Sequence, residues 1–336
     1  MQFLGFGIVR GEKRIDSRRL TADSSNPVTA DCSCISNLYL HDIAPDRVVA
    51  IGEVLWDIFP HDTRLGGAPL NFAVHARKLG HPAYLVSALG SDDLGRRAAE
   101  QIAALDVDTT FLQTVSCPTG TATVNLHAEQ STSFTIHRPA AYDALSFTAD
   151  DLHRLKERHP AWLYFGTLFA SNDTGHTVLN RVLDELDSTV KFYDVNLRPS
   201  CDSPELVKQL LERAHVVKLN EEELQRVKEV SGLPASTESF CREGSARYGW
   251  DAVAVTLGSR GCALLANNVY VEEGGLRVDV ADTVGAGDAF AAALMHGLSA
   301  SWPLREIAKF ANRVGAIVAS RHGALPHWTV EEAMKL

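Results

Sequence analysis

The segment from Asp282 to Phe290, Asp-Thr-Val-Gly-Ala-Gly-Asp-Ala-Phe, contains the residues best suited to chemistry. Gly285 and Gly287 permit a tight turn before a run of small residues that predicts a helix, and the unpaired amides at a helix start attract anions. Asp288 is unexpected beside an anion, because a carboxylate repels phosphate. It fits there as a base that accepts the proton of a hydroxyl group attacking that phosphate. A glycine turn followed by an acidic first-turn residue explains the segment equally well when it is taken alone.

A second glycine-rich segment, Leu65-Gly-Gly-Ala-Pro-Leu-Asn71, precedes another predicted helix. The backbone can approach a ligand closely at Gly67, and the amide of Asn71 offers a donor and an acceptor to a sugar hydroxyl. Pro69 also suits the first turn of a helix, and this structural interpretation is the stronger one for the motif alone. Asp57 lies just past the first predicted strand, where parallel sheets bind ligands.

Three further segments also follow predicted strands. Arg198, at the end of Asp194-Val-Asn-Leu-Arg, is either a phosphate clamp or a surface charge. Asn220 and Glu223 share one face of a first helical turn, which suits oxygen ligands around hydrated Mg²⁺. An ordinary capping box explains that pair as well. The segment 256–261, Thr-Leu-Gly-Ser-Arg-Gly, is either a turn that faces a ligand or a tight connection.

Composition and missing motifs exclude several classes of function. The 32 Lys and Arg residues against 42 Asp and Glu residues give a net charge of −10, which disfavours nucleic-acid and anionic-membrane partners. The absence of any Gly-Lys pair excludes a Walker A motif. The six cysteines are scattered without zinc-site spacing, so we expect reduced thiols in a cytoplasmic protein. No apolar run approaches the length of about 20 residues that a membrane span needs.

Short apolar runs alternate with helical patterns from residue 47 onward, and this βαβα order predicts a parallel sheet covered by helices. The expected strands are 48–51, 84–89, 162–165, 191–195, 215–219, 252–257 and 262–265. The expected helices are 67–79, 93–104, 175–186, 204–213, one that starts at 221, 236–247, 286–299 and 304–320. We expect one domain over 47–336, preceded by a poorly ordered extension over 1–46.

The section between the second predicted helix and residue 140 departs from this order. Polar and apolar residues alternate with period two in 121–126 and 132–137, around a turn at 129–131. This pattern predicts a β-hairpin inserted into the α/β order. An inserted small sheet often covers a site as a lid.

These motifs, in this order, resemble the PfkB-type carbohydrate kinases of the ribokinase superfamily, from residue 47 to the C-terminus. The Gly-Gly element that ends at Asn71 and the Asp-Thr-x-Gly-Ala-Gly-Asp element that ends at Asp288 match the two signatures of that family. The segment 52–71 is similar to the fructokinase branch. Ribokinases carry a lysine where this chain has Ala68, so the resemblance to them is weaker.

The resemblance implies an α/β fold: a three-layer α/β/α sandwich, ribokinase-like, with a mainly parallel central sheet and a small β-sheet lid. We expect lid elements around 58–65 and 110–140. Lids in this family often pair across a dimer, which makes the 121–137 hairpin a candidate edge for a homodimer. The lid residues expected to select the acceptor are Asn125, His137 and Arg138.

The resemblance also implies roles for individual residues. The residues expected in catalysis are Asp288, as the base, and Gly285, Ala286 and Gly287, whose amides would hold the transferring phosphoryl group. The residues expected to bind the sugar or its phosphate are Asp57, Gly67, Asn71 and Arg198. The residues expected at the ATP site are Asn220, Glu223, Thr256, Gly258, Gly261 and Asn312, of which the first two would organise Mg²⁺ through water. A K⁺ site is implied at Asp282, Val284, Val318 and Gly323.

The function that follows is ATP- and Mg²⁺-dependent phosphorylation of a primary hydroxyl group of a monosaccharide. D-fructose, giving fructose 6-phosphate, is the leading acceptor because of the fructokinase-like segment 52–71. Another acceptor, namely 2-keto-3-deoxygluconate, ribose or a nucleoside, is the first alternative. A non-catalytic sugar-sensing protein is the second, and the presence of Asp288 and its neighbouring glycines argues against it.

Overall fold

The computed structural model describes residues 45–126, 132–199, 201–234 and 236–336. The extension expected over 1–46 therefore lies, except for its last two residues, outside the described part of the chain. Asp46 already belongs to the fold, because its carboxylate accepts hydrogen bonds from Trp162 Nε1 (3.2 Å) and Ser299 Oγ (2.6 Å). These contacts join the start of the folded domain to a central strand and to a covering helix.

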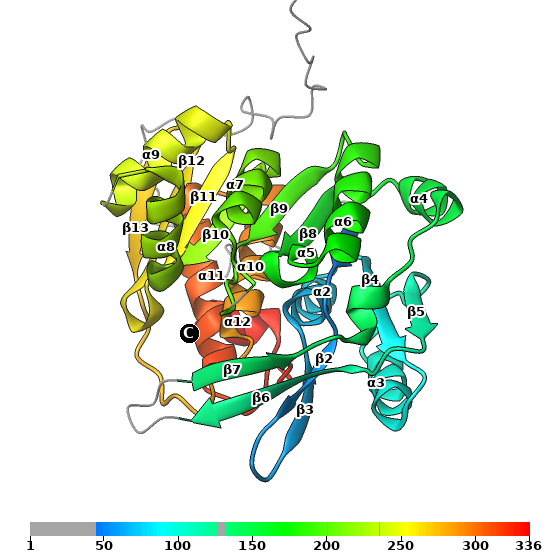
Figure 1. Ribbon diagram of the computed structural model, residues 1–336. Helices are drawn as coiled ribbons and strands as arrows, with labels where there is room; N and C mark the ends of the chain where they lie inside the picture. Colours follow the sequence, from blue (N-terminus) through cyan, green and yellow to red (C-terminus); the bar gives the residue numbers. More distant parts are fainter. Residues whose placement is uncertain (1–44, 127–131, 200, 235) are drawn as a thin grey trace, which may run out of the picture.

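A nine-stranded sheet forms the middle layer (Figure 1). Its strand order is β13-β12-β11-β10-β9-β8-β1-β4-β5, and β12 is the strand that runs opposite to the common direction of the others. The strands are β1 (Val48–Ile51), β4 (Ala83–Gly90), β5 (Leu112–Val115), β8 (Trp162–Gly166), β9 (Val190–Asp194), β10 (Val216–Asn220), β11 (Ala252–Thr256), β12 (Gly261–Ala266) and β13 (Val269–Gly274). The inner strands are almost continuously apolar, because helices cover both of their faces.

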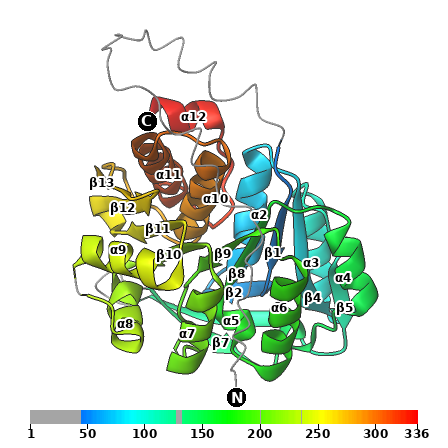
Figure 2. The same cartoon turned by 90° about the horizontal axis from the view of Figure 1, so that it is seen from above.

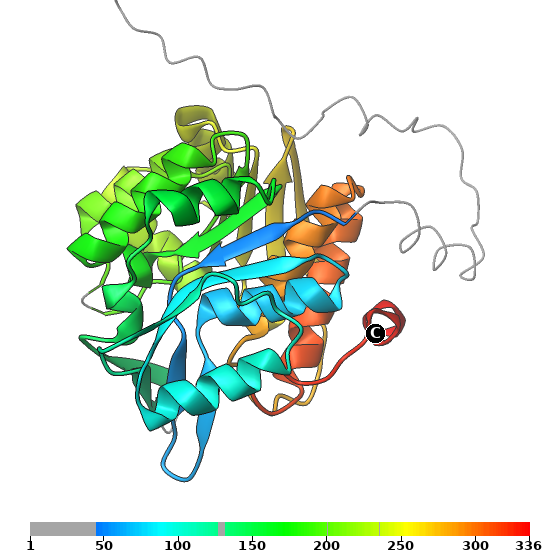
Figure 3. The same ribbon diagram turned by 90° about the vertical axis from the view of Figure 1, so that its right-hand side faces the viewer.

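Helices pack on both faces of this sheet, so the expected three-layer sandwich is confirmed (Figures 2 and 3). One face is covered by α2 (Ala68–Lys78), α3 (Asp93–Ala103), α10 (Ala286–Ser299) and α11 (Leu304–Ala319), with α12 (Val330–Lys335) against α11. The other face is covered by α4 (Ala149–Lys156), α5 (Thr167–Ala170), α6 (Asp173–Glu185), α7 (Pro204–Arg213), α8 (Glu221–Ser231) and α9 (Thr237–Tyr248). Two short 3₁₀ turns are η2 (Ala141–Ala144) and η3 (Gly258–Arg260). None of the helices in the described residues is both long enough and apolar enough to cross a membrane.

A separate four-stranded sheet has the order β3-β2-β6-β7. Its strands are β2 (Leu55–Ile58), β3 (Thr63–Gly66), β6 (Gly120–Leu126) and β7 (Thr132–His137). The antiparallel β6–β7 pairing confirms the predicted hairpin, while its turn at 129–131 lies outside the described residues. The range 110–140 is divided between the two sheets, since β5 pairs with β4 in the large sheet. The small sheet begins three residues after β1 ends, so it lies at the carboxyl ends of the central strands (Figure 1).

The side chain of Phe72 holds α2 against the large sheet. It is fully buried, and its ring stacks on Tyr164 of β8 with the centroids 3.9 Å apart and meets Phe192 of β9 edge-on at 5.8 Å. We expect Phe72→Ala to lower the free energy of unfolding by about 3–5 kcal/mol, because the cavity removes both ring contacts. Urea unfolding followed by circular dichroism measures this change. Val269→Ala, at a position where 54% of the residue is exposed, is the control and should change stability by less than about 0.5 kcal/mol.

Candidate active site

The side chains of Asn71 and Asp288 meet where α2 and α10 begin. Asn71 Nδ2 donates a hydrogen bond to Asp288 Oδ2 at 2.8 Å, although the two residues are 217 positions apart in the sequence. Asn71 is buried, and its Oδ1 has no hydrogen-bond partner among the described residues, whereas Asp288 is only partly covered. A free acceptor beside an accessible carboxylate can engage two hydroxyl groups of one small molecule.

Two glycines allow the turn before α2 to pack against the ends of β1 and β2. Gly67 has a φ of 113°, and a Cβ atom there would stand 2.4 Å from the carbonyl oxygen of Glu53. A Cβ atom on Gly66 would stand 2.8 Å from Asp57 Oδ2. Glycine is therefore required at Gly67, whereas a side chain at Gly66 would displace the Asp57 carboxylate. The turn places the buried carboxylate of Asp57 close to the start of the helix that carries Asn71.

The start of α10 is shaped by a third glycine. Gly285 has a φ of 79°, and a Cβ atom there would stand 2.6 Å from Ala324 in the C-terminal loop. The first amides of a helix have no acceptor within it, although the amide of Ala286 bends back to the Thr283 carbonyl at 3.3 Å. The amides at this helix start, and the positive end of its dipole, can hold an anion next to Asp288.

A buried ion pair lies directly beneath the start of α10. Lys218 Nζ is 3.0 and 3.1 Å from the two carboxylate oxygens of Asp194, and Tyr164 donates its hydroxyl to the same carboxylate at 3.0 Å. A Cβ atom on Gly287 would stand 3.1 Å from Lys218 Nζ, so the ammonium group is next to the helix start. The sequence interpretation missed both residues as members of the site. A charged residue within the apolar run of β10, and another at the end of β9, are the signals that could have found them.

The pKa of Asp288 is raised to about 7. Burial is the main cause, and the negative charge of Asp194 adds to it. The hydrogen bond from Asn71 and the positive charges of Lys218 and Arg198 act in the opposite direction and lower the pKa. Asp288 can therefore take up or release a proton close to neutral pH, as a general base requires.

Burial also raises the pKa values of Glu53 and Asp57 to about 7. The positive charge of Arg198 lowers both values in part, so this guanidinium acts on the same acids that surround the start of α2. Arg198 Nη1 donates to the carbonyl of Leu197 at 3.1 Å, and the guanidinium lies 5.2 Å from the ring centroid of Phe134 on β7. The sequence-predicted Asp57 and Arg198 are thus brought into one electrostatic environment with Asp288.

Glu53 was also missed by the sequence interpretation. Its own amide and the amide of Ala68, which opens α2, lower the pKa of its carboxyl group in part. Its Oε2 is buried without a partner among the described residues, as is the hydroxyl oxygen of Tyr142. A charged residue between two apolar strand patterns, immediately before a strand that carries a predicted ligand, is the signal that points to it.

Asn220 and Glu223 form the capping box that the sequence allowed as the structural alternative. Asn220 Oδ1 accepts from the Glu223 amide and Glu223 Oε2 accepts from the Asn220 amide, each at 2.8 Å. Glu223 Oε1 accepts from the Leu197 amide at 2.9 Å. The described residues contain no cluster of three His, Cys, Asp or Glu side chains that could hold a metal ion. Each of these three oxygens accepts one amide and keeps further lone-pair capacity, so the pair can accept hydrogen bonds from water molecules.

The predicted nucleotide residues divide into two groups. Thr256 is the register neighbour of Asn220 at the carboxyl ends of β11 and β10, and Gly258 has a φ of 60° with open space where a Cβ atom would stand. Gly261, in contrast, has its Cβ position 2.0 Å from the carbonyl oxygen of Glu273. Gly258 therefore suits a turn that faces a ligand, whereas Gly261 is required by a tight connection.

Asn312 supports that connection from α11. Its Nδ2 donates to the carbonyl oxygens of Glu273 (3.3 Å) and Gly274 (3.2 Å) at the end of β13. The side chain is buried. Asn312 thus fixes the wall next to Gly258 through the backbone of β13.

Three of the four residues expected around K⁺ meet at the Asp282 carboxylate, and Val318 lies next to them, because the Asp282 amide donates to the carbonyl of Ala319 at 3.1 Å. Asp282 Oδ1 accepts from the Val284 amide at 3.0 Å, and Asp282 Oδ2 accepts from the Gly323 amide at 3.1 Å. The carbonyl of Val318 accepts instead from the amide of Arg321 at 3.1 Å. The amides of Val284 and Gly323 thus use part of the acceptor capacity of the Asp282 carboxylate.

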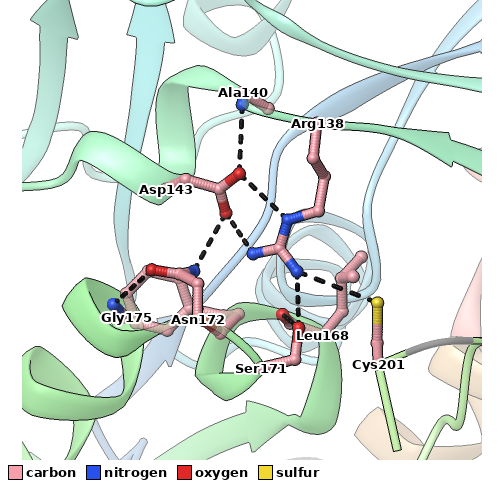
Figure 4. Close-up of polar contacts among 9 residues, drawn as sticks. Arg138, Ala140, Asp143, Leu168, Ser171, Asn172, Gly175 and Cys201 are labelled. Atoms are coloured by element: carbon pink, nitrogen blue, oxygen red, sulfur yellow. Dashed lines mark hydrogen bonds and ion pairs between the residues drawn. The ribbon is translucent and has the colours of Figure 1, made fainter.

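Arg138 is one of the three lid residues expected to select the acceptor, and its guanidinium is bonded to other side chains of the protein (Figure 4). Its guanidinium forms a two-pronged ion pair with Asp143 and donates to Ser171 Oγ at 2.5 Å. These bonds fasten the end of β7 to η2 and to the end of α5. His137 contacts Thr123 Oγ1 at 2.8 Å on the exposed face of the hairpin, and the side chain of Asn125 lies outside the described residues.

Comparison with known proteins shows the family to which the chain belongs. Residues 59–329 match the family described as pfkB family carbohydrate kinase. The chain belongs to this family. As a carbohydrate kinase of the pfkB family, it is a phosphotransferase, and the resemblance stated from the sequence is confirmed.

Curated and structurally known pfkB kinases are similar over almost their whole length. Fructokinase-1 of Zea mays is 30% identical over 314 residues, covering 85% of this chain and 95% of that protein. The aminoimidazole riboside kinase of Salmonella typhimurium is 30% identical over 302 residues, covering 84% and 92%. The fructokinase of Vibrio cholerae O395, solved with fructose, ADP and calcium ion, has a TM-score of 0.71 at 26% identity, covering 83% and 94%. A double mutant of that fructokinase, solved with fructose, ADP and potassium ion, has a TM-score of 0.72 at 25% identity, covering 84% and 96%.

The raised pKa of Glu53 predicts a pH-dependent stability. Its pKa is about 7 in the folded protein against an ordinary value of 4.5, so the folded state keeps a proton that the unfolded chain releases. The corresponding stabilisation is present below the unfolded value and is lost as pH rises through about 7. We expect Glu53→Gln to raise the free energy of unfolding by about 1–3 kcal/mol at about pH 8 and by less at about pH 5.

Urea unfolding at the two pH values measures this difference. Glu243→Gln, at an exposed position of α9, is the matched control and should change stability equally little at both. A Glu53→Gln variant that is no more stable than wild type at the higher pH contradicts the account.

Proposed function

We propose that this carbohydrate kinase transfers the γ-phosphoryl group of ATP to the primary hydroxyl group of D-fructose and forms fructose 6-phosphate. The hydrogen bond between Asn71 and Asp288 carries the proposal, because it joins a group suited to hold a sugar to a group suited to activate it. The maize fructokinase supports fructose as the acceptor. The fructose and ADP named for the Vibrio structure are the acceptor and the nucleotide product of the proposed reaction, and they support it.

In the proposed reaction, Asp288 accepts the proton of the primary hydroxyl group as its oxygen attacks the γ-phosphorus. The bond from that phosphorus to the β–γ bridging oxygen breaks, and ADP leaves with the bond electrons. The amides of Gly285, Ala286 and Gly287 and the ammonium group of Lys218 would stabilise the charge on the phosphoryl oxygens. Asp288 then returns its proton to solvent, which a pKa of about 7 favours at neutral pH.

The nucleotide would lie along the carboxyl ends of β10 and β11. Thr256 and the open face of Gly258 would contact it, with Gly261 and Asn312 shaping the adjacent wall. Mg²⁺ supplies charge neutralisation on the phosphates when it is bound. Asn220 and Glu223 would hold its waters, because their oxygens already accept backbone amides and remain able to accept a second hydrogen bond.

The charge of the site favours a neutral acceptor. The carboxyl groups of Glu53, Asp57 and Asp288 all lie within the field of the Arg198 guanidinium, with Arg64 acting also on Asp57 and Lys218 also on Asp288. A polyhydroxyl sugar can donate to such carboxyl groups, whereas the carboxylate of 2-keto-3-deoxygluconate would be repelled by them. A riboside is the second candidate, and the 30% identity to aminoimidazole riboside kinase favours it.

The free thiols of Cys117, Cys201, Cys241 and Cys262 support the cytoplasmic location expected for the reaction.

An acceptor screen tests the proposal. ADP release should be measured with ATP and Mg²⁺ over D-fructose, 2-keto-3-deoxygluconate, ribose and aminoimidazole riboside. We expect the highest kcat/KM with D-fructose. Asp288→Asn should lower kcat by about 10²–10⁴-fold with little change in ATP affinity, because it removes the base and keeps the hydrogen-bonding shape.

Asp173→Asn is the matched control, since Asp173 is an exposed acidic residue in the first turn of α6. It should leave kcat unchanged. An Asp288→Asn variant that retains nearly full turnover contradicts the assignment of the base. The absence of turnover with every acceptor would favour the sugar-sensing alternative.

The raised pKa of Asp288 also predicts the pH dependence of turnover. The base is active only when ionised, so kcat should fall about tenfold per pH unit below the Asp288 pKa of about 7. Asp194→Asn removes a negative charge that raises this pKa, so it should move the acid limb of the pH profile to lower pH by about one unit. Thermal unfolding confirms that the variant is folded. An acid limb that stays in place or moves to higher pH contradicts the prediction.

A further inference from the structure

Arg64 connects the small sheet to the loop that precedes α10. It lies on β3, and its Nη1 is 2.5 Å from Asp282 Oδ2. Its side chain passes over the C-terminal loop, where its Cδ is 3.9 Å from the position that a Cβ atom on Gly323 would take. The Arg64 side chain therefore lies next to Gly323, whose amide donates to the same Asp282 oxygen.

The carboxylate of Asp282 is enclosed by three donors. The Val284 amide donates to Oδ1, and the Gly323 amide and the Arg64 guanidinium both donate to Oδ2. A carboxylate offers about four lone-pair positions, so most of its acceptor capacity is used. Only 12% of the Asp282 side chain is exposed. Its negative charge is thus balanced by a cationic side chain of the same protein.

This arrangement does not fit a monovalent metal ion as well. Such an ion would need the Asp282 carboxylate, whose negative charge is already paired with the guanidinium of Arg64. Two cations sharing one carboxylate repel each other at this distance.

We propose that Arg64 supplies the positive charge at Asp282, so that phosphoryl transfer by this chain needs no K⁺ at that place. The proposal rests on the proposed kinase function. Arg64 acts as a positioning residue and does not touch the reacting atoms. It holds Asp282, whose carboxylate fixes the amides of Val284 and Gly323 on either side of the turn that presents the first amides of α10.

The hairpin β2–β3 sets the guanidinium in place. Asp62 forms a second ion pair with Arg64 Nε at 2.5 Å, and the guanidinium lies 4.5 Å from the ring centroid of Phe59. The Asp62 side chain is 51% exposed, so this pair contributes little to stability. The positive charge that balances Asp282 therefore belongs to a residue of the small sheet. The position of that sheet thus affects the loop before α10.

The first test compares cations at a fixed ionic strength of about 0.15 M, with KCl, NaCl or choline chloride as the salt. We expect the kcat of the wild-type enzyme to differ by less than about twofold among the salts. Arg64→Gln should lose about ten- to a hundredfold in kcat in choline chloride, because the turn before α10 is released. KCl should restore part of that loss, since the vacated carboxylate then accepts a cation. Asp62→Asn, which leaves the contact with Asp282 intact, should behave as wild type.

A second readout does not depend on turnover. In the absence of substrates, KCl should raise the Tm of Arg64→Gln relative to choline chloride, and it should leave the Tm of the wild type unchanged. A wild-type enzyme that KCl activates several-fold, with the same activation in Arg64→Gln, overturns the proposal. A folded Arg64→Gln variant with unchanged kcat and no response to K⁺ also overturns it. A failure of the kinase proposal would appear as no turnover in any salt, and the Tm comparison would still decide the role of Arg64.

Discussion

The hydrogen bond from Asn71 to Asp288 is the constraint on which the candidate site depends. It requires the starts of α2 and α10 to stand side by side on one face of the sheet, and the glycines before each helix permit that approach. Gly67 brings the first turn of α2 onto the backbone at Glu53, and Gly285 brings the first turn of α10 onto the C-terminal loop. A side chain at either glycine would separate the amide from the carboxylate, because backbone atoms lie within 3 Å of both Cβ positions.

Three acids around this contact have pKa values close to neutral pH, although such side chains are ordinarily ionised there. Burial raises the pKa values of Glu53, Asp57 and Asp288 to about 7, while Arg198 and Lys218 limit the rise. The ion pair of Lys218 with Asp194 places a fixed positive charge next to the start of α10 without leaving it unpaired. The carboxyl groups of Glu53, Asp57 and Asp288 and the guanidinium of Arg198 thus share one electrostatic environment. The ion pair of Arg64 with Asp282 likewise places a paired positive charge in the loop before α10.

The sequence predicted the order of the parallel strands and covering helices, because buried strands are continuous apolar runs and helices have a regular spacing. It did not indicate β5, β13 or α4. The strands β5 and β13 lie at the edges of the large sheet, and the helix α4 has only two buried residues. The two glycine signatures located Asn71 and Asp288, because a turn that needs a positive φ requires glycine, and glycine is visible in the sequence. Glu53, Lys218 and Asp194 were missed, because a single charged residue in an apolar run shows burial only once its partners are known. Arg64 could not be paired with Asp282, since the ion pair joins residues 218 positions apart.

A crystal structure with D-fructose and a non-hydrolysable ATP analogue tests the central claim most directly. The account predicts that the primary hydroxyl group of fructose lies about 2.6–3.2 Å from the Asp288 carboxylate, with a second hydroxyl group donating to Asn71 Oδ1. The γ-phosphate of the analogue should lie at the first amides of α10. Fructose bound away from Asp288, or a complex in which Asp288 keeps only its contact with Asn71, would contradict the account.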